Sequence, residues 1–271
     1  MTDNYQTGIR DLLGQYKRNR MKYQTNIVEI WSEKDAISNI LKRVTERYTI
    51  PVMVNRGYSS SSAMHNAYQR IADYILDGKN FHLYYFGDHD PSGLDMIRDI
   101  EQRIVFFLIK GKASNKIKNI VGDWWDWWVD SSNYIHDLIR MELLNEDQVN
   151  EIYHSGDSDL SESVQSAYET AIARLFFKEK GIFKVVPIGL TMEQIEEFDP
   201  PPNPAKITDS RAKWYINKFG DMSWEVDALN PQDMARIVEE KILESIDVDE
   251  YDRVIAEEEA DKTALKKFAK L

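Results

Sequence analysis

Short apolar runs alternate with amphipathic stretches over the first 110 residues of the chain. The runs are rich in β-branched and aromatic residues, which favour strands. The stretches between them repeat apolar residues at helical spacing, as Ile37, Leu41 and Val44 do. The pattern predicts strands at 27–31, 51–54 and 81–86, and helices at about 32–48, 63–76 and 94–109.

This order of strands and helices predicts an α/β fold with a central, mostly parallel sheet flanked by helices. Residues 110–180 are expected to be mainly helical, and 182–188 to form another strand. Four prolines make 198–206 an extended segment. Helices are expected again at about 208–219 and 231–246.

Charge is distributed unevenly along the chain. The net charge of -12 disfavours a polyanionic partner for the surface as a whole. The N-terminal residues are basic, whereas the C-terminal residues are strongly acidic and are expected to form a solvated helix face. We divide the chain into a basic arm (1–26), the first part of the core (27–110), a helical insertion (111–180), the completion of the core with a C-terminal extension (181–246) and an acidic tail (247–271).

The composition excludes several classes of protein. Cysteine is absent, which rules out disulfides, thiolate metal sites and cysteine nucleophiles. The longest strongly apolar run, 104–109, is too short to span a bilayer. The first residues lack the basic and apolar regions of a secretory signal. We therefore expect a cytoplasmic protein with no membrane partner.

Three carboxylates follow predicted strands. Glu33 comes after the first strand, and Asp88 and Asp90 come after the third. Functional groups of parallel sheets gather at the carboxyl ends of the strands, and alternate residues can point to one side. Carboxylate oxygens are the ligands that Mg²⁺ prefers. The sequence therefore predicts a metal site here, with Gly93 allowing a sharp turn into the next helix.

The segments that carry these carboxylates resemble a known family. Trp31–Ala36 and Gly87–Asp95 resemble the two motifs of the Toprim domain, most closely in the topoisomerase VI A-subunit family, and 55–59 resembles its glycine turn. The resemblance covers about 27–110 and implies a Toprim, Rossmann-like sheet. It also implies chemistry on DNA or RNA that depends on Mg²⁺ or Mn²⁺.

By this resemblance, Glu33 is the general acid or base, and Asp88 and Asp90 bind the metal. Members of the family place a cleaving tyrosine in a winged-helix domain ahead of the Toprim module. Here about 26 residues precede the first strand, too few for such a domain. Metal-dependent hydrolysis by a nuclease therefore stands beside a second hypothesis, a catalytically silent subunit. That subunit would bind nucleic acid or a separate winged-helix protein, and a homodimer stays open.

Each acidic residue also has a structural interpretation, since carboxylates after strands often cap helices. A calcium loop at Asp88–Gly93 is rejected, because such a loop follows a helix and 81–86 is a poor helix. Phosphohydrolases of the haloacid dehalogenase type also use Asp-x-Asp after a strand. In that family the motif normally ends the first strand, so it is the weaker enzyme alternative.

Substrate contacts are expected from basic residues near the strand ends. Lys34 is included in the catalytic set, and Arg56, His89, Lys206 and Arg211 are assigned to substrate binding. For Lys34 and Arg56 a solvated charge is the alternative, and for His89 it is a ring turned away from substrate. The tryptophans at 124–128 either stack unpaired bases or pack against a helix or partner chain.

A second polar cluster is predicted in the C-terminal part of the chain. It comprises Asp209, Glu225 and Asp227, and we expect it to border the metal site. Surface ion pairing is the alternative. A separation from Asp88 above about 15 Å would exclude a direct or water-bridged role at the metal.

Overall fold

Four parallel strands form the centre of the computed structural model, which describes residues 8, 11–54, 60–130, 138, 143–155, 160–206 and 212–268. The strands lie in the order β2-β1-β3-β4, and every neighbouring pair is parallel. Their bounds are β1 (Asn26–Ser32), β2 (Val52–Val54), β3 (Asn80–Phe86) and β4 (Phe183–Gly189). The predicted α/β fold with a parallel sheet is therefore confirmed.

The two central strands are covered on both faces. In β1 and in β3, six of the seven residues are buried, as expected for a parallel sheet flanked by helices. The strands pair in register, with Ile30 opposite Tyr84 and Trp31 opposite Tyr85. Because they run in the same direction, the segments that follow Ser32 and Phe86 leave the sheet at the same edge.

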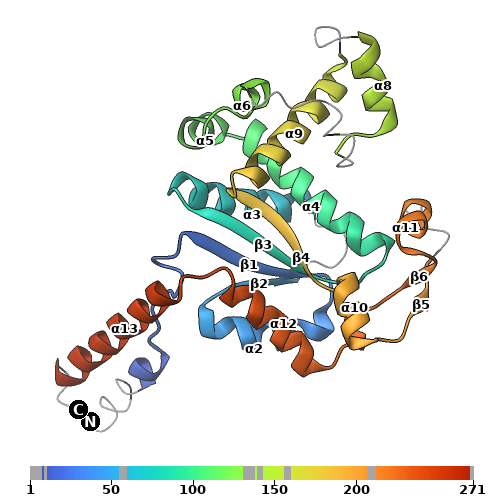
Figure 1. Cartoon of the computed structure of the whole chain (residues 1–271). Helices are drawn as coiled ribbons and strands as arrows, with labels where there is room; N and C mark the ends of the chain where they lie inside the picture. The colour runs from blue at the N-terminus through green and yellow to red at the C-terminus, as the bar shows by residue number, and fades with distance from the viewer. Residues whose placement is uncertain are drawn as a thin grey trace.

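Helices cover the two faces of the sheet as Figure 1 shows. On one face lie α3 (Ser61–Leu76) and α4 (Pro91–Lys110), and on the other α2 (Ser38–Thr45) and α12 (Pro231–Leu243). The helix expected at 32–48 is divided, since 3-10 turns at Asp35–Ile37 and Glu46–Tyr48 flank α2. It begins late because Lys34 has an extended backbone.

Most of the helical insertion lies beyond α4, although the C-terminal part of its last helix reaches the core of the sheet (Figure 1). It contains α5 (Ser114–Val121), α6 (Trp124–Asp130), α8 (Glu146–Ser155) and α9 (Glu162–Glu179). Trp124 packs against Phe177 of α9, and Trp127 against Phe176. Trp128 is buried as well, whereas Trp125 is 39% exposed. Packing against a helix is therefore the interpretation that holds for most of this tryptophan cluster.

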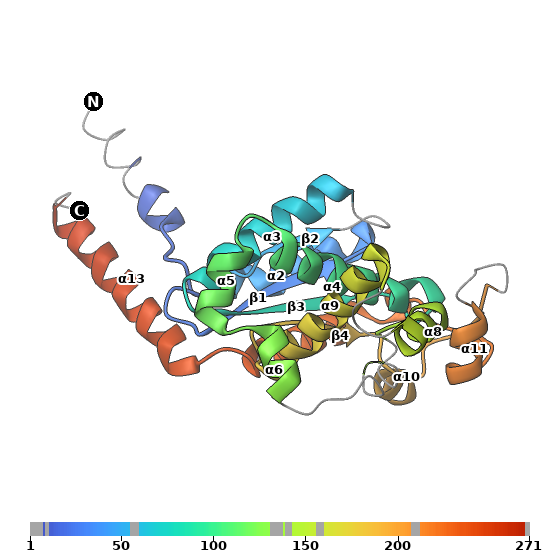
Figure 2. The ribbon, with the colours of Figure 1, turned by 90° about the horizontal axis from the view of Figure 1, so that it is seen from above.

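Several short elements gather near the carboxyl edge of the sheet, at one end of the molecule in Figures 1 and 2. They are α10 (Met192–Phe198), β5 (Asn203–Pro204), α11 (Ala212–Phe219), β6 (Met222–Ser223) and a 3-10 turn, η3 (Val226–Ala228). The segment expected to be extended over 198–206 begins later, because Phe198 ends α10 and Asp199 has a left-handed backbone; its β5 pairs antiparallel with β6.

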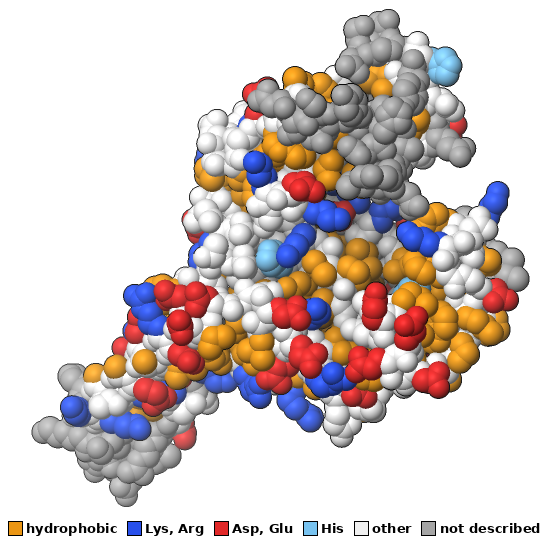
Figure 3. Space-filling model, in the orientation of Figure 1, with side chains coloured by type: hydrophobic (Ala, Val, Ile, Leu, Met, Phe, Trp, Pro, Cys, Tyr) orange, Lys and Arg blue, Asp and Glu red, His pale blue; other side chains and the backbone are white. Residues whose placement is uncertain are grey.

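The N-terminal arm and α13 (Val248–Phe268) extend together from the opposite end of the sheet (Figures 1 and 2). Arg18 contacts Glu257 and Asp261, and Arg20 lies 2.8 Å from Glu258. Figure 3 shows acidic and basic side chains interspersed along this extension.

The expected solvated acidic face is found at exposed carboxylates such as Asp249 and Glu259, but not at Glu258, which is 3% exposed and has its charge matched by the arm. The seven residues of β1 separate the arm from the carboxyl edge by roughly 20 Å. None of the helices in the described ranges has the length and apolar character needed to cross a membrane.

Candidate metal centre

Glu33 and Asp88 meet at the carboxyl edge because the strands that precede them are neighbours. Glu33 directly follows β1, and Asp88 lies two residues beyond β3. Burial raises the pKa of the Glu33 carboxyl group, and the charges of Asp88 and Asp90 raise it further. The nearby cations Lys34 and Lys206 oppose this effect. An ionised Glu33 is therefore costly at this position, chiefly because its carboxyl group is partly buried.

Lys34 lies among three carboxylates. Its Nζ is 3.1 Å from Asp88 Oδ2, 2.9 Å from Asp227 Oδ1 and 3.4 Å from Glu225 Oε2. Burial lowers the pKa of this ammonium group, but hydrogen bonds to Asp227 and Asp88 outweigh burial, so the net shift is upward. The same ammonium lowers the pKa of Asp227, against the effect of burial. A cation is thus stably accommodated beside Asp88.

Asp88 is fixed by two different donors. Its Oδ1 accepts a 2.8 Å hydrogen bond from the backbone N–H of Val226, and its Oδ2 faces Lys34. Burial nevertheless raises the pKa of Asp88, although both donors act in the opposite direction. An ionised Asp88 is therefore costly at this position and is stabilised by any added positive charge.

Asp90 has a structural role at the start of α4. Its Oδ1 accepts a 2.6 Å hydrogen bond from the backbone N–H of Gly93, so it caps the helix. Gly93 is required here by close approach, since a Cβ at this position would lie 2.3 Å from the carbonyl oxygen of Asp88. The cap and the glycine together fix the turn that carries both aspartates.

His89 is buried among aromatic side chains, which corrects its assignment to substrate binding. Its side chain is buried, with 3% exposure for the residue. Its Nδ1 is 2.9 Å from the hydroxyl of Tyr215, and its ring meets Phe219 edge to face at 4.8 Å. Its backbone also pairs with Trp224. Burial lowers the pKa of His89, in keeping with a neutral structural ring.

Two residues of the predicted second polar cluster, Glu225 and Asp227, lie at the candidate metal centre, where Lys34 links them to Asp88. Glu225 and Asp227 both contact Lys34, which contacts Asp88, so the predicted proximity is found. Asp227 lies in η3 rather than in an extended strand. The contacts are ion pairs, which was the alternative interpretation. Lys206 is exposed and acts on Glu33 through its charge.

Three of the predicted site residues, Arg56, Asp209 and Arg211, lie outside the described residues. Tyr215 and Val226 were not predicted, because neither a buried tyrosine nor a backbone N–H has a sequence signature. Their contacts depend on segments more than a hundred positions away along the chain.

The donor chemistry of the centre fits Mg²⁺. Within the described ranges, no three His, Asp or Glu side chains converge as a ready-made metal site. Mg²⁺ does not require such a cage, because it keeps several waters and is commonly held by one or two carboxylates. Asp88 and Glu33 are the carboxylates available for such a role, and burial raises the pKa of both.

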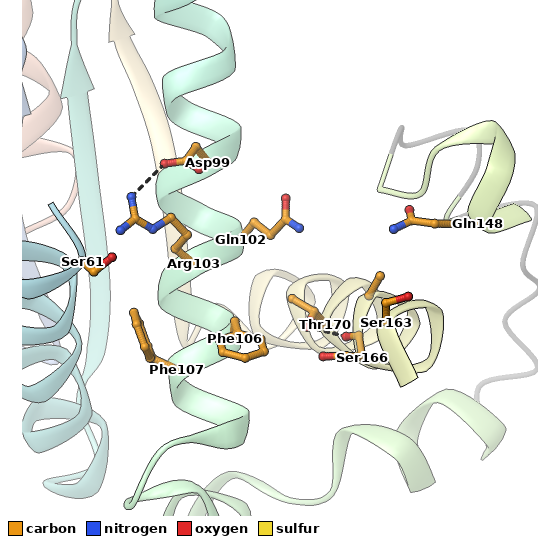
Figure 4. Close-up of a pocket in the computed structure, with 11 residues that line it drawn as sticks. Ser61, Asp99, Gln102, Arg103, Phe106, Phe107, Gln148, Ser163, Ser166 and Thr170 are labelled. Carbon is orange, nitrogen blue, oxygen red and sulfur yellow. Dashed lines mark hydrogen bonds and ion pairs between the residues drawn. The ribbon is translucent and has the colours of Figure 1, made fainter. Parts of the chain in front are cut away.

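A separate cleft of about 520 Å³ lies between α4, α8 and α9 (Figure 4). Gln102, Phe106 and Ser166 are among its lining residues, and Arg103 is turned toward Asp99, 3.3 Å away. None of the carboxylates of the candidate metal centre lines it. The cleft is therefore distinct from that centre.

Comparisons of this chain with protein-family models, with curated proteins and with solved structures found no match.

Proposed function

We propose that this chain is a Toprim-like protein that carries out Mg²⁺-dependent phosphodiester cleavage in DNA or RNA. The observation that carries the proposal is the pair of carboxylates at neighbouring strand ends, Glu33 and Asp88: burial raises the pKa of both, and the charge of Asp88 raises the pKa of Glu33 further. Such a pair favours a divalent cation and a group that exchanges protons. The resemblance of the two motif segments to Toprim motifs supports the same assignment.

Each residue has a defined part in this proposal. Asp88, oriented by Val226 and Lys34, offers carboxylate oxygen to the metal. Bound Mg²⁺ would polarise the scissile phosphate and lower the pKa of a coordinated water. Burial and the charge of Asp88 raise the pKa of Glu33, which suits this carboxyl group to exchange a proton during the reaction. Lys206, which is exposed, adds positive charge that attracts the phosphate backbone, whereas the charge of Lys34 is matched by its three carboxylate partners.

A second candidate function is a partner-dependent subunit that binds nucleic acid without cutting it alone. The contacts of two N-terminal tyrosines favour it over cleavage by a tyrosine of the described arm. Tyr16 donates a 2.7 Å hydrogen bond to Asp261, and Tyr23 a 2.9 Å hydrogen bond to Glu257. Both tyrosines therefore contact α13, at the end of the sheet opposite the metal centre. A tyrosyl mechanism would need a tyrosine from elsewhere.

The test is incubation of the purified protein with supercoiled plasmid and with single-stranded RNA, in Mg²⁺ or Mn²⁺. Asp88→Ala is compared with Asp73→Ala, which removes an exposed carboxylate on α3. Metal-dependent cleavage that is lost only in Asp88→Ala supports a nuclease at this centre. If well-folded wild-type protein leaves both substrates intact, the nuclease proposal is rejected in favour of the partner-dependent subunit. Cleavage that persists in Asp88→Ala would contradict the assignment of the site.

A further inference from the structure

The helix α11 is basic on a strongly acidic chain. It contains Lys213 and Lys218 and no acidic residue, whereas the whole chain has a net charge of -12. Both lysines are exposed, and Trp214 between them is 39% exposed. In Figure 3 the surface over α11, at the right of the view, carries basic side chains beside hydrophobic ones. Basic side chains bind the phosphates of a nucleic acid and an aromatic ring stacks on its bases, so this surface has the groups needed for both contacts.

This surface is coupled to the metal centre by direct contacts. Tyr215 of α11 meets the Nδ1 of His89 at 2.9 Å, and Phe219 packs on the same imidazole. Phe219 in turn contacts Trp214, with 6.0 Å between the ring centroids. His89 is the residue between Asp88 and Asp90. The tryptophan therefore lies two ring contacts away from the motif that carries the metal-binding carboxylate.

The side chains of α11 are already organised for such a contact. The ammonium of Lys218 lies 5.0 Å from the centroid of the Trp214 ring and 5.6 Å from that of Phe219. A cation at this distance from an aromatic ring is attracted by its π electrons. The contact holds Lys218 beside the exposed Trp214, so that the lysine can bind a phosphate while the tryptophan stacks on the base of the same nucleotide.

We propose that Lys213, Trp214 and Lys218 form a binding surface for single-stranded nucleic acid beside the metal centre. The inference rests on the proposed function and deepens it by naming the strandedness of the substrate. Bases in a duplex stack on each other, so only an unpaired base can stack on Trp214. The lysines hold the phosphates on either side of that base.

The experiment is a binding titration of labelled single-stranded and duplex oligonucleotides in EDTA, followed by fluorescence anisotropy. Trp214→Ala is expected to weaken single-strand binding roughly tenfold. The double variant Lys213→Gln/Lys218→Gln is expected to lower the slope of log affinity against log salt by about 1.4, because two phosphate contacts are lost. Binding to duplex is expected to be weaker than to single strands.

Matched controls come from the helical insertion. Trp125 is also 39% exposed, and Lys118 lies over the Trp124 ring at 5.3 Å. Trp125→Ala and Lys118→Gln are expected to leave binding unchanged. To separate binding from misfolding, Trp214→Phe and the Lys→Arg double variant are expected to restore most of the affinity, since they keep the ring and the charges.

Three outcomes would overturn the inference: unchanged single-strand binding in both α11 variants, equal losses in the insertion controls, or equal affinity for duplex and single strands. No cleavage takes place in EDTA, so the result does not depend on catalysis. Plasmid cleavage that requires Asp88, combined with unchanged binding in the α11 variants, would reject the surface and keep the proposed function. Oligonucleotide binding that depends on α11, without any cleavage of the plasmid, would keep the binding surface and reject the proposed cleavage.

Discussion

The backbone N–H of Val226 donates a 2.8 Å hydrogen bond to Asp88 Oδ1, joining two residues that are 138 positions apart in the sequence. The bond brings the 3-10 turn η3 onto the end of β3 and leaves Asp88 Oδ2 facing Lys34. The orientation of the carboxylate therefore depends on three segments of the chain. The candidate centre is assembled by the fold, beyond what the two motifs alone specify.

Gly93→Ala is expected to disrupt the turn that carries both aspartates. The added methyl group would lie 2.3 Å from the carbonyl oxygen of Asp88, which is backbone and cannot rotate away. Overpacking of this kind costs about 1–3 kcal/mol. We expect a lower melting temperature and a loss of any metal-dependent activity, measured by thermal unfolding and by the cleavage assay.

Gly14→Ala is the matched control for this substitution. Gly14 lies in the helical stretch 11–15, and no atom lies within 4 Å of the position its Cβ would take. Alanine favours helices over glycine, so stability is expected to stay the same or rise slightly. An equal loss of stability in the two variants would show that close packing at Gly93 is not the cause.

Glu33→Gln is expected to stabilise the metal-free protein at neutral pH. The pKa of Glu33 is raised above 4.5 by burial and by Asp88 and Asp90, so the folded state binds its proton more tightly than the unfolded state. The free energy of unfolding therefore falls as pH rises from 4.5 through the raised pKa of Glu33. Glutamine carries no charge, so the variant does not lose this stability. Thermal unfolding in EDTA at pH 7 is expected to give a midpoint about 2–4 °C higher.

The gain is expected to shrink as pH falls below 4.5, where Glu33 becomes protonated in the unfolded state as well as in the folded state. Glu46→Gln, at an exposed position 3.7 Å from Lys17, serves as the control and is expected to change little. A lower melting temperature of Glu33→Gln at pH 7 would mean that the ionised carboxylate stabilises the fold, against this account.

Glu258→Gln is expected to loosen α13 from the N-terminal arm. Burial alone would raise the pKa of Glu258, but hydrogen bonds from Lys262, Arg18 and Arg20 lower it to about 2. Removing one partner of a buried ion pair costs roughly 3–5 kcal/mol. The low pKa makes this stabilisation complete above pH 4.5 and lost as pH falls toward 2.

Urea unfolding at pH 7 and at pH 3 measures this effect, and the difference from wild type is expected to shrink at pH 3. Glu259→Gln is the control, because Glu259 also pairs with Lys262 but its side chain is 63% exposed. Its change is expected to stay below about 1 kcal/mol. Equal effects of the two substitutions would contradict a special role for the buried pair.

Much of the sheet was predictable because its signals are local. The strands at 27–31 and 81–86 are apolar runs that end at polar turns, and β1 and β3 match them within one residue at each end. The meeting of Glu33 and Asp88 followed from the rule that neighbouring parallel strands end at one edge. The capping role of Asp90 was also an open alternative, since Asp is a frequent N-cap.

The remaining features depend on contacts between distant segments. Arg18 and Arg20 meet α13 about 240 positions away, so their charges gave no indication of a partner within the chain. The orientation of His89 is set by Tyr215, 126 positions later. Lys34 could be placed after a strand, but its three carboxylate partners could not be assigned, because ion pairing depends on side-chain geometry that no spacing encodes.

The most direct test of the metal centre is a titration of Mn²⁺ followed by electron paramagnetic resonance, without nucleic acid. Wild-type protein is compared with Asp88→Asn and with Asp73→Asn, the exposed control on α3. Wild type and Asp73→Asn are expected to bind Mn²⁺ alike, whereas Asp88→Asn binds at least roughly tenfold more weakly, since a carboxylate ligand is lost. Equal Mn²⁺ binding by Asp88→Asn and wild type would contradict a metal centre at the carboxyl edge of the sheet.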